Sequence, residues 1–400
     1  GGGHGGQGGE EEEEEDPPAA AAARRLRRRA GPALHPGGCG CCPLQRGELT
    51  ADGRPPRRRS SPPRVVRVRR LVSLVQRFHG VYYHFALEAL PRLLAAADYL
   101  KGDAGMQVLA DTSGPYARYF LEEIFGLDAG RVLPYDPNAI YVAEELLLVP
   151  APLPCGHVPR AALAPLRRRY AAHAAGLLRA LLLRGEEEEE ERPPPPPPPP
   201  GNASALSSPD ARAAEEEVEF LDEDALRGLL RAEIALPDDT EEGGAGGGGR
   251  GGEKKGGKKK LLLVLQRRGP RSVANFAELA AGLRRAFAGP GGGWRVVPYA
   301  AEGRPVAEQA ALFGAAAAVV APHGSGLANL AFALRPGELT LVELLPWSYP
   351  NLTFYLLGAA LGLGRHCLWA ADGADAYTAL RVDVPALMDE LLDGKCSLIV

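Results

Sequence analysis

The sequence is poor in cysteine, methionine and aromatic residues, and it lacks any long apolar run. It contains 6 cysteines and 2 methionines, and 6% of its residues are aromatic. The cysteines are too few for a disulfide scaffold and lack the spacing of a zinc site. No run of 18 or more apolar residues occurs, so neither a membrane span nor a signal peptide is expected within this sequence. The net charge of −4 indicates no particular class of partner.

Glycine and proline are abundant instead, at 50 and 37 of 400 residues, and they gather in low-complexity tracts. The tracts with too few apolar side chains to offset the entropy of ordering are Gly1–Asp16, Gly185–Gly201 and Glu241–Lys260. We therefore expect a disordered tail over residues 1–64 and a linker over 185–260, with a short helix near 216–235. The remaining residues, 65–184 and 261–400, are expected to form two α/β domains.

Arginine is concentrated toward the N-terminal end of the chain. Fourteen arginines fall between Arg24 and Arg70, where the only acidic residues are Glu48 and Asp52. Such a segment would suit nucleic acid or an anionic membrane surface. A solvated tail is the preferred interpretation, because no aromatic side chains are interleaved for stacking on bases. No nucleic-acid partner is therefore expected.

Strands alternate with helices along both domains, which is typical of parallel sheets with helices on both faces. In the first domain we expect strands at 65–75, 107–110, 131–135 and 140–149, and helices at 83–100, 116–125 and 160–184. In the second we expect strands at 261–266, 294–298, 315–321, 339–344 and 365–369, and helices at 275–287, 305–314, 327–334, 352–361 and 385–393. Two such domains place a ligand in the cleft between them, at the carboxyl ends of the strands.

The most informative stretch runs from Ala315 to Pro346. Its first strand leads into the sequence Pro-His-Gly-Ser-Gly, where Gly324 and Gly326 allow a sharp turn and a close approach to a ligand. A short apolar helix follows, and the N-terminus of a helix attracts anions, most often phosphate. The next strand carries Glu343 near its carboxyl end, where a carboxylate can accept hydrogen bonds from ribose hydroxyls. The pattern indicates nucleotide or sugar-nucleotide binding.

The same stretch leaves a dehydrogenase as a competing interpretation. Gly324-x-Gly326-x-x-Asn329 departs from the dinucleotide-binding fingerprint in having Asn at the third glycine position, and Glu343 lies at nearly the expected distance. It is not a nucleophile elbow, because the residues two before and two after Ser325 are not glycines. A Rossmann oxidoreductase that uses NAD or NADP therefore remains an alternative interpretation.

His84 and Glu88 lie four residues apart in the expected helix 83–100, hence on one face. Pro91 removes the helical hydrogen bond to Leu87 and should kink the helix there. A histidine and a glutamate at the rim of a cleft could supply a general base for a hydroxyl nucleophile. The alternative is a surface pair that only stabilises the helix slightly.

A basic loop follows the expected strand 261–266. Arg267 and Arg271 at the carboxyl end of this strand could neutralise a diphosphate leaving group, and the alternative is a solvated basic loop. Asn275 is expected to cap the next helix, with Glu278 as its capping-box partner.

Two weaker patterns concern metals and glycosylation. Asp222 and Asp224 could form a metal-binding pair, but helix capping by Asp222 is the preferred interpretation, so no metal site and no cofactor are expected. Asn202 and Asn351 begin tripeptides that fit the N-glycosylation pattern, which weakly favours a lumenal location.

Three ordered motifs resemble glycosyltransferase family 61, the group that includes plant xylosyl- and arabinosyltransferases and animal O-linked N-acetylglucosamine transferases of the secretory pathway. The pattern H-x-x-x-E-x-L-P-R-L matches residues 84–93, and R-x-[IV]-x-N-x-x-E-L matches 271–279. H-G-[AS]-G-L-x-N matches 323–329 and is followed by Glu343 and a proline. The resemblance covers roughly residues 65–370. One departure is Gln266, where a serine commonly precedes the arginine; others are the large inserted linker and the short stretch after Trp347, where a GT-B fold has its cross-over helix.

The resemblance implies a GT-B fold, in which two Rossmann-like domains face a central cleft. It implies inverting transfer of a sugar, without a bound metal, from a nucleotide sugar, usually a UDP-sugar, to a hydroxyl of a glycan or glycoprotein. The residues expected to hold the nucleotide are Arg267, Arg271, His323, Gly324, Ser325, Gly326, Asn329 and Glu343. His84 or Glu88 is expected to be the base, with His84 preferred because its ordinary pKa lies nearer neutrality.

The family also implies the lumen of the Golgi or endoplasmic reticulum, with a membrane reached only through an N-terminal anchor outside this sequence. A catalytically inactive, carbohydrate-binding relative is the non-enzyme alternative. The sequence does not distinguish hexose from pentose donors or identify the acceptor.

Overall fold

The computed structural model describes residues 63–76, 78–149, 158–190, 223–232, 234, 258–289, 292–349 and 351–393. All of them belong to one compact unit that spans Cys39–Val400. The predicted tail except residues 63 and 64, most of the predicted linker, and Asp222 and Asn202 lie outside the described residues. The predicted domain boundaries therefore stay predictions.

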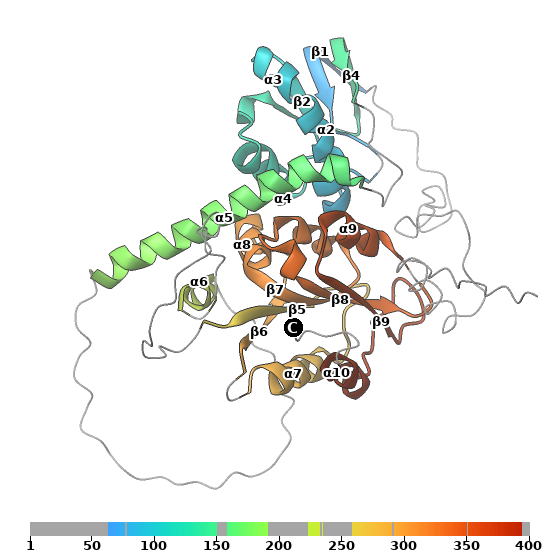
Figure 1. Ribbon diagram of the computed structural model, residues 1–400. Helices are drawn as coiled ribbons and strands as arrows, with labels where there is room; N and C mark the ends of the chain where they lie inside the picture. The colour runs from blue at the N-terminus through green and yellow to red at the C-terminus, as the bar shows by residue number, and fades with distance from the viewer. Residues whose placement is uncertain are drawn as a thin grey trace, which may run out of the picture. The chain divides into compact units, whose positions relative to one another are not determined.

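The N-terminal half of the described chain is built on a parallel sheet with the strand order β3-β2-β1-β4 (Figure 1). Its strands are β1 (Arg64–Ser73), β2 (Gln107–Ala110), β3 (Val132–Pro134) and β4 (Ala139–Leu147). A short 3₁₀ helix, η3 (Ala129–Arg131), precedes β3. All four strands lie where apolar runs predict them, with ends that differ by three residues or fewer.

The helix predicted over residues 83–100 is divided into three pieces. A π-helix, η1 (His84–Ala89), leads into α2 (Leu90–Ala95) and α3 (Ala97–Gly102). The N–H of Leu90 donates to the carbonyl of Phe85, five residues back. Because Pro91 has no N–H and its ring disfavours an ordinary helical turn before it, the disturbance takes the form of a π-turn rather than a simple kink. The helix predicted over 116–125 likewise divides into α4 (Pro115–Tyr119) and a π-helix, η2 (Phe120–Ile124).

The C-terminal half contains a second parallel sheet, with the order β6-β5-β7-β8-β9. Its strands are β5 (Lys260–Gln266), β6 (Trp294–Ala300), β7 (Ala316–Pro322), β8 (Thr340–Pro346) and β9 (Arg365–Ala371). Two 3₁₀ helices, η4 (Ser325–Phe332) and η5 (Pro336–Glu338), lie between β7 and β8. The short apolar helix predicted after β7 is therefore present, but in the tighter 3₁₀ form.

Alternate residues of each central strand point into different cores, as a sheet covered on both faces requires. In β5, Leu262 and Val264 belong to one buried cluster, and Leu261, Leu263 and Leu265 belong to another. The helices α7 (Phe276–Phe287) and α10 (Val384–Leu392) cover the first face, and α8 (Val306–Ala315) and α9 (Thr353–Leu361) cover the second (Figure 1).

A long helix, α5 (Arg160–Glu190), connects the two halves and packs against α2, α8, η4 and α9. The buried Tyr170 on α5 donates to the carbonyl of Ala86 at 2.7 Å and stacks on Phe332 with ring centroids 4.8 Å apart. The short helix α6 (Glu223–Ala232) also lies against α5. One buried core thus continues from the first sheet to the second. The parallel α/β class is confirmed, whereas a GT-B arrangement of two separate domains stays a prediction.

Among the described residues, no helix is both long enough and apolar enough to cross a membrane.

Candidate nucleotide-binding site

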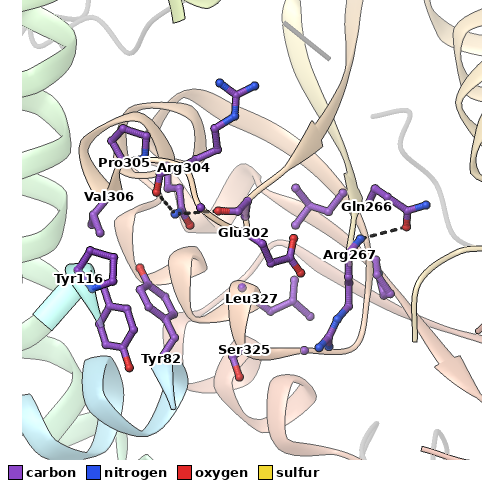
Figure 2. Close-up of a pocket in the computed structure, with 18 of the residues that line it drawn as sticks. Tyr82, Tyr116, Gln266, Arg267, Glu302, Arg304, Pro305, Val306, Ser325 and Leu327 are labelled. Carbon is purple, nitrogen blue, oxygen red and sulfur yellow. Dashed lines mark hydrogen bonds between the residues drawn. The ribbon is translucent and has the colours of Figure 1, made fainter. Parts of the chain in front are cut away.

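A cavity of about 710 Å³ lies at the carboxyl ends of β5, β6 and β7 (Figure 2). One wall consists of Tyr82, Tyr116 and Tyr119 from the N-terminal half. The opposite side consists of Arg267, which follows β5, and the glycine turn that follows β7. The loop 301–306 after β6 completes the lining. Its volume falls within the range of pockets that bind small ligands, and the ends of parallel strands are where α/β proteins bind them.

Arg267 and Arg271 form a cationic pair beside this cavity. The Nη1 of Arg267 donates to the carbonyl oxygen of His323 at 2.8 Å, which holds the guanidinium against the glycine turn. Burial lowers the pKa of Arg267, and repulsion from Arg271 lowers it further. Burial also lowers the pKa of Arg271. Neither arginine forms an ion pair with a carboxylate within the described residues. The carboxylate of Glu302, which lines the same cavity, raises the pKa of Arg267 but does not outweigh burial. Two partly buried cations that form no ion pair are an environment that favours binding of an anion.

Gln266 holds the loop that carries both arginines. Its Oε1 accepts hydrogen bonds from the backbone N–H groups of Arg267 and Val273, at 3.0 and 2.9 Å. Its Nε2 donates to the carbonyl of Val273 at 3.0 Å. These three bonds close the loop across seven residues. Gln266 therefore fixes the arginine loop with an amide that both donates and accepts.

Gly324 provides the space that Arg267 occupies. A Cβ atom added at Gly324 would overlap the guanidinium of Arg267, whereas one added at Gly326 would meet nothing within 4 Å. The backbone at Gly324 is extended, so close approach, and not a left-handed conformation, explains the glycine. Ser325 and Gly326 also line the cavity.

His323 and Glu343 lie deeper than the cavity. The Nδ1 of His323 is 2.5 Å from Oε1 of Glu343, and the Nε2 of His366 on β9 is 2.9 Å from Oε2 of Glu343. Glu343 is 0% exposed. Burial alone would raise the pKa of Glu343, but the hydrogen bonds and charges of the two histidines outweigh it and lower that pKa. Contact between Glu343 and ribose stays a prediction, and it would require one of these hydrogen bonds to be replaced.

Asn329 links the two halves of the chain. Its Oδ1 accepts a hydrogen bond from the hydroxyl of Tyr82 at 2.5 Å, and its Nδ2 donates to Oε1 of Gln309 at 2.7 Å. It is 0% exposed and does not line the cavity, although both partners do. Burial raises the pKa of Tyr82, so its hydroxyl remains a donor. Asn329 therefore supports the cavity wall from behind.

His84 and Glu88 contact one another as their spacing predicts, with Nδ1 2.8 Å from Oε2. They are 4% and 7% exposed, so the alternative of a surface pair is wrong. The ring of Phe78 packs against His84 with centroids 5.3 Å apart, and Gln76 lies between Glu88 and Arg92. Neither His84 nor Glu88 lines the cavity. Their predicted catalytic role stays a prediction.

Two sequence-based expectations are corrected by the structure. Asn275 stands at the start of α7, but its side chain makes no capping bond. It instead donates to the carbonyl of Val382 and to Glu278, and it accepts from the N–H of Val382, so it fastens the segment before α10. Asn351 is 4% exposed, and its Oδ1 accepts from the N–H of Thr353, so it is not presented as a glycosylation acceptor.

Sequence reasoning missed Glu302 and the tyrosine wall. Glu302 lies just beyond β6 and points into the cavity, whereas Arg304 points away from it (Figure 2). The first acidic residue after a predicted strand is a signal that could have identified it, because parallel strands end at one edge. Within the described part of the chain, no three histidine, cysteine, aspartate or glutamate residues cluster as metal ligands would.

A comparison with protein families matches residues 82–340 to the family model described as Glycosyltransferase 61. The matched span is more than half of the chain and includes the tyrosine wall, the arginine loop and the glycine turn. No match is found among the curated proteins.

Proposed function

The chain belongs to glycosyltransferase family 61, and we propose that it transfers a sugar from a UDP-sugar to a hydroxyl of a glycan or glycoprotein. Membership in this family implies glycosyltransferase activity in general. The observation that carries the proposed donor is the pair of partly buried arginines, neither in an ion pair with a described carboxylate, beside the glycine turn of a cavity of about 710 Å³. The transfer inverts the configuration at the anomeric carbon, as the family resemblance implies.

The diphosphate is proposed to lie along Gly324–Gly326, against the guanidinium of Arg267. Charge develops on the diphosphate as its bond to the sugar breaks, and positioned cations stabilise that charge most effectively in a site shielded from water. Arg271 adds a second positive charge behind the first. Ser325 supplies a hydroxyl at the same turn.

The nucleoside is proposed to occupy the part of the cavity near the loop after β6. Glu302 offers a carboxylate there that could accept hydrogen bonds from ribose hydroxyls. We favour Glu302 over Glu343 for this role, because both oxygens of Glu343 already accept from histidines. The role proposed for Glu343 is to orient His323 beneath the turn.

The reaction is proposed to take place in the lumen of the Golgi or endoplasmic reticulum. The family resemblance implies this location.

The test is calorimetric titration of the full chain with UDP and with NADH. We expect binding of UDP, and Arg267→Ala should raise its Kd about a hundredfold, since a charged contact to a phosphate in a shielded site is lost. Arg268→Ala is the matched control, because Arg268 lies in the same loop but is exposed. Binding of NADH without UDP would instead establish the oxidoreductase alternative.

Turnover of the donor is expected to continue in EDTA, because arginines supply the charge that a divalent cation would otherwise supply. Loss of turnover in EDTA and its return with Mn²⁺ would contradict this part of the proposal.

A further inference from the structure

A histidine and an aspartate meet at the carboxyl edge of the N-terminal sheet, outside the cavity lining. The strands β1 and β2 are parallel neighbours paired in register, so the segments that follow them leave the sheet side by side. His79 belongs to the first segment, and Asp111 is the first residue after β2. The Nδ1 of His79 lies 2.8 Å from Oδ2 of Asp111.

Asp111 is arranged to remain ionised. Its Oδ1 accepts a hydrogen bond from the backbone N–H of Ser113 at 2.9 Å. Burial alone would raise the pKa of Asp111, but the hydrogen bonds from Ser113 and His79 outweigh burial and lower that pKa. An ionised carboxylate only accepts hydrogen bonds, so the shared proton belongs to Nδ1 of His79. The lone pair of the neutral ring is then on Nε2, where a base needs it.

The surroundings fix this ring and leave one side of it open. The ring edge of His79 packs against Tyr135 with centroids 4.9 Å apart, and 25% of the side chain of His79 is exposed. No described residue forms a hydrogen bond with Nε2. The preceding residue, Phe78, has a φ of 63°, a left-handed conformation that bulky residues rarely adopt and that occurs preferentially at functional sites. Phe78 packs on the buried His84.

The pair adjoins the tyrosine wall of the cavity. The carbonyl of Gly80, the residue after His79, accepts a hydrogen bond from the hydroxyl of Tyr116 at 2.8 Å. The rings of Tyr116 and Tyr82 pack 5.0 Å apart, and both line the cavity. This wall lies across the cavity from Arg267 (Figure 2). His79 is thus joined, through Gly80 and Tyr116, to the wall that lies across the cavity from Arg267.

We propose that His79 is the general base of the sugar transfer and that Asp111 is its positioning residue; the assignment rests on the proposed glycosyltransferase reaction. Nε2 of His79 takes the proton of the acceptor hydroxyl while the hydroxyl oxygen bonds to the anomeric carbon. The bond from that carbon to the diphosphate oxygen breaks, and its electron pair leaves with UDP. Asp111 stabilises the imidazolium that forms, which then releases its proton to solvent.

The experiment compares two nucleophiles that differ in their need for a base. The full chain is first screened with UDP-xylose, UDP-arabinose and UDP-N-acetylglucosamine for a donor that it hydrolyses without acceptor. Water must lose a proton when it attacks, whereas the azide anion need not. His79→Gln should therefore slow hydrolysis a hundredfold or more, while added azide restores donor consumption and yields the inverted glycosyl azide. The Kd for UDP should stay within about twofold of the wild-type value.

The matched control uses another aspartate at the same edge of the sheet. Asp136 follows β3, and its Oδ1 accepts from the N–H of Asn138 at 2.8 Å, just as Asp111 accepts from Ser113, but no histidine among the described residues forms a hydrogen bond or ion pair with Asp136. Asp111→Asn should slow hydrolysis at least tenfold and keep the azide reaction, whereas Asp136→Asn should leave both reactions at wild-type rates.

Several results would overturn the assignment. They are full hydrolysis by His79→Gln, slow hydrolysis that azide does not rescue, or azide rescue in His84→Gln but not in His79→Gln. The last result would assign the base to the buried His84–Glu88 pair. A wild-type chain that neither binds UDP nor consumes any of the three donors would refute the proposed function itself, and the base assignment with it. A chain that consumes a donor while His79→Gln behaves as wild type would refute only the base.

Discussion

The carboxyl edges of the two parallel sheets carry opposite chemistry. At the N-terminal sheet, His79 and Asp111 form a pair in which a carboxylate balances the histidine. At the C-terminal sheet, Arg267 and Arg271 lie close together, and no described carboxylate forms an ion pair with either one. Both edges result from the same rule, since parallel strands deliver the residues that follow them to one side. The difference supports the proposed division of roles, in which one half accepts a proton and the other holds an anion.

The two halves also differ in how they use a carboxylate. Asp111 contacts one histidine and lies at the surface edge of the sheet, whereas Glu343 contacts two histidines and is 0% exposed. The first arrangement leaves a histidine nitrogen available for chemistry. The second uses both carboxylate oxygens within the protein, which suits a role in holding the glycine turn in place.

The largest effect that tests this distinction is expected from Glu343→Gln. Removing one partner from a buried ionic cluster typically costs about 3 kcal/mol or more, because the remaining polar groups stay buried. We therefore expect the free energy of unfolding to fall by about 3 kcal/mol at pH 7, measured by urea denaturation. Asp111→Asn should lose much less stability, since its pair is partly exposed. Equal losses would contradict the distinction.

The same variant predicts a pH dependence with a defined sign. The folded-state pKa of Glu343 is lowered, so its contribution to stability is present above the unfolded pKa, about 4.3 for a glutamate. That contribution is lost as the pH falls through the lower, folded pKa. The difference between wild type and Glu343→Gln should thus be constant near neutrality and shrink below about pH 4. If the stability difference between the two proteins grows as the pH falls, folding raises the pKa of Glu343 and the prediction is wrong.

The sequence predicts the strands of this fold well and the residues that meet across them poorly. Apolar runs place β5 and β7 to within one residue, because burial on both faces leaves a continuous apolar signature. Pro91 predicts the break in the helix 83–100, but the π-helical form of that break depends on local geometry. His366 and Glu343 lie on neighbouring strands 23 residues apart, and only the strand order brings them together.

The dependence on strand order also explains why the sequence did not reveal two of the candidate residues. His79 and Asp111 are 32 residues apart, and neither belongs to a recognisable motif. The predicted pair of His84 and Glu88 is visible because its spacing is helical, but its burial is a tertiary property. Motifs thus identify residues that are close in sequence, while the strand order identifies those that share an edge.

A smaller effect is expected when a side chain at position 324 fills the space that Arg267 occupies. In Gly324→Ala, the new methyl group displaces the guanidinium, which can move because it ends a flexible side chain. The fold should persist, and the Kd for UDP should rise about tenfold, equivalent to about 1.4 kcal/mol. Gly326→Ala adds its methyl group to open space, so its effect on the Kd should be smaller. Calorimetry on both variants measures the difference, and a stronger effect at Gly326 would move the anion site away from Arg267.

An effect of similar size concerns the hydrogen bond between Tyr82 and Asn329, which joins the two halves. Tyr82 of the N-terminal half donates to Asn329 of the C-terminal half, and the acceptor is 0% exposed. Tyr82→Phe would leave a buried amide oxygen without this donor, which typically costs about 1–2 kcal/mol. Tyr116→Phe is the matched control, because its hydroxyl bonds to the carbonyl of Gly80 at an exposed position where water can replace it. Urea denaturation of both variants should show the larger loss for Tyr82→Phe. If the two lose equal stability, the bond between Tyr82 and Asn329 contributes no more than an exposed one, and the halves are held together by the apolar core around α5 alone.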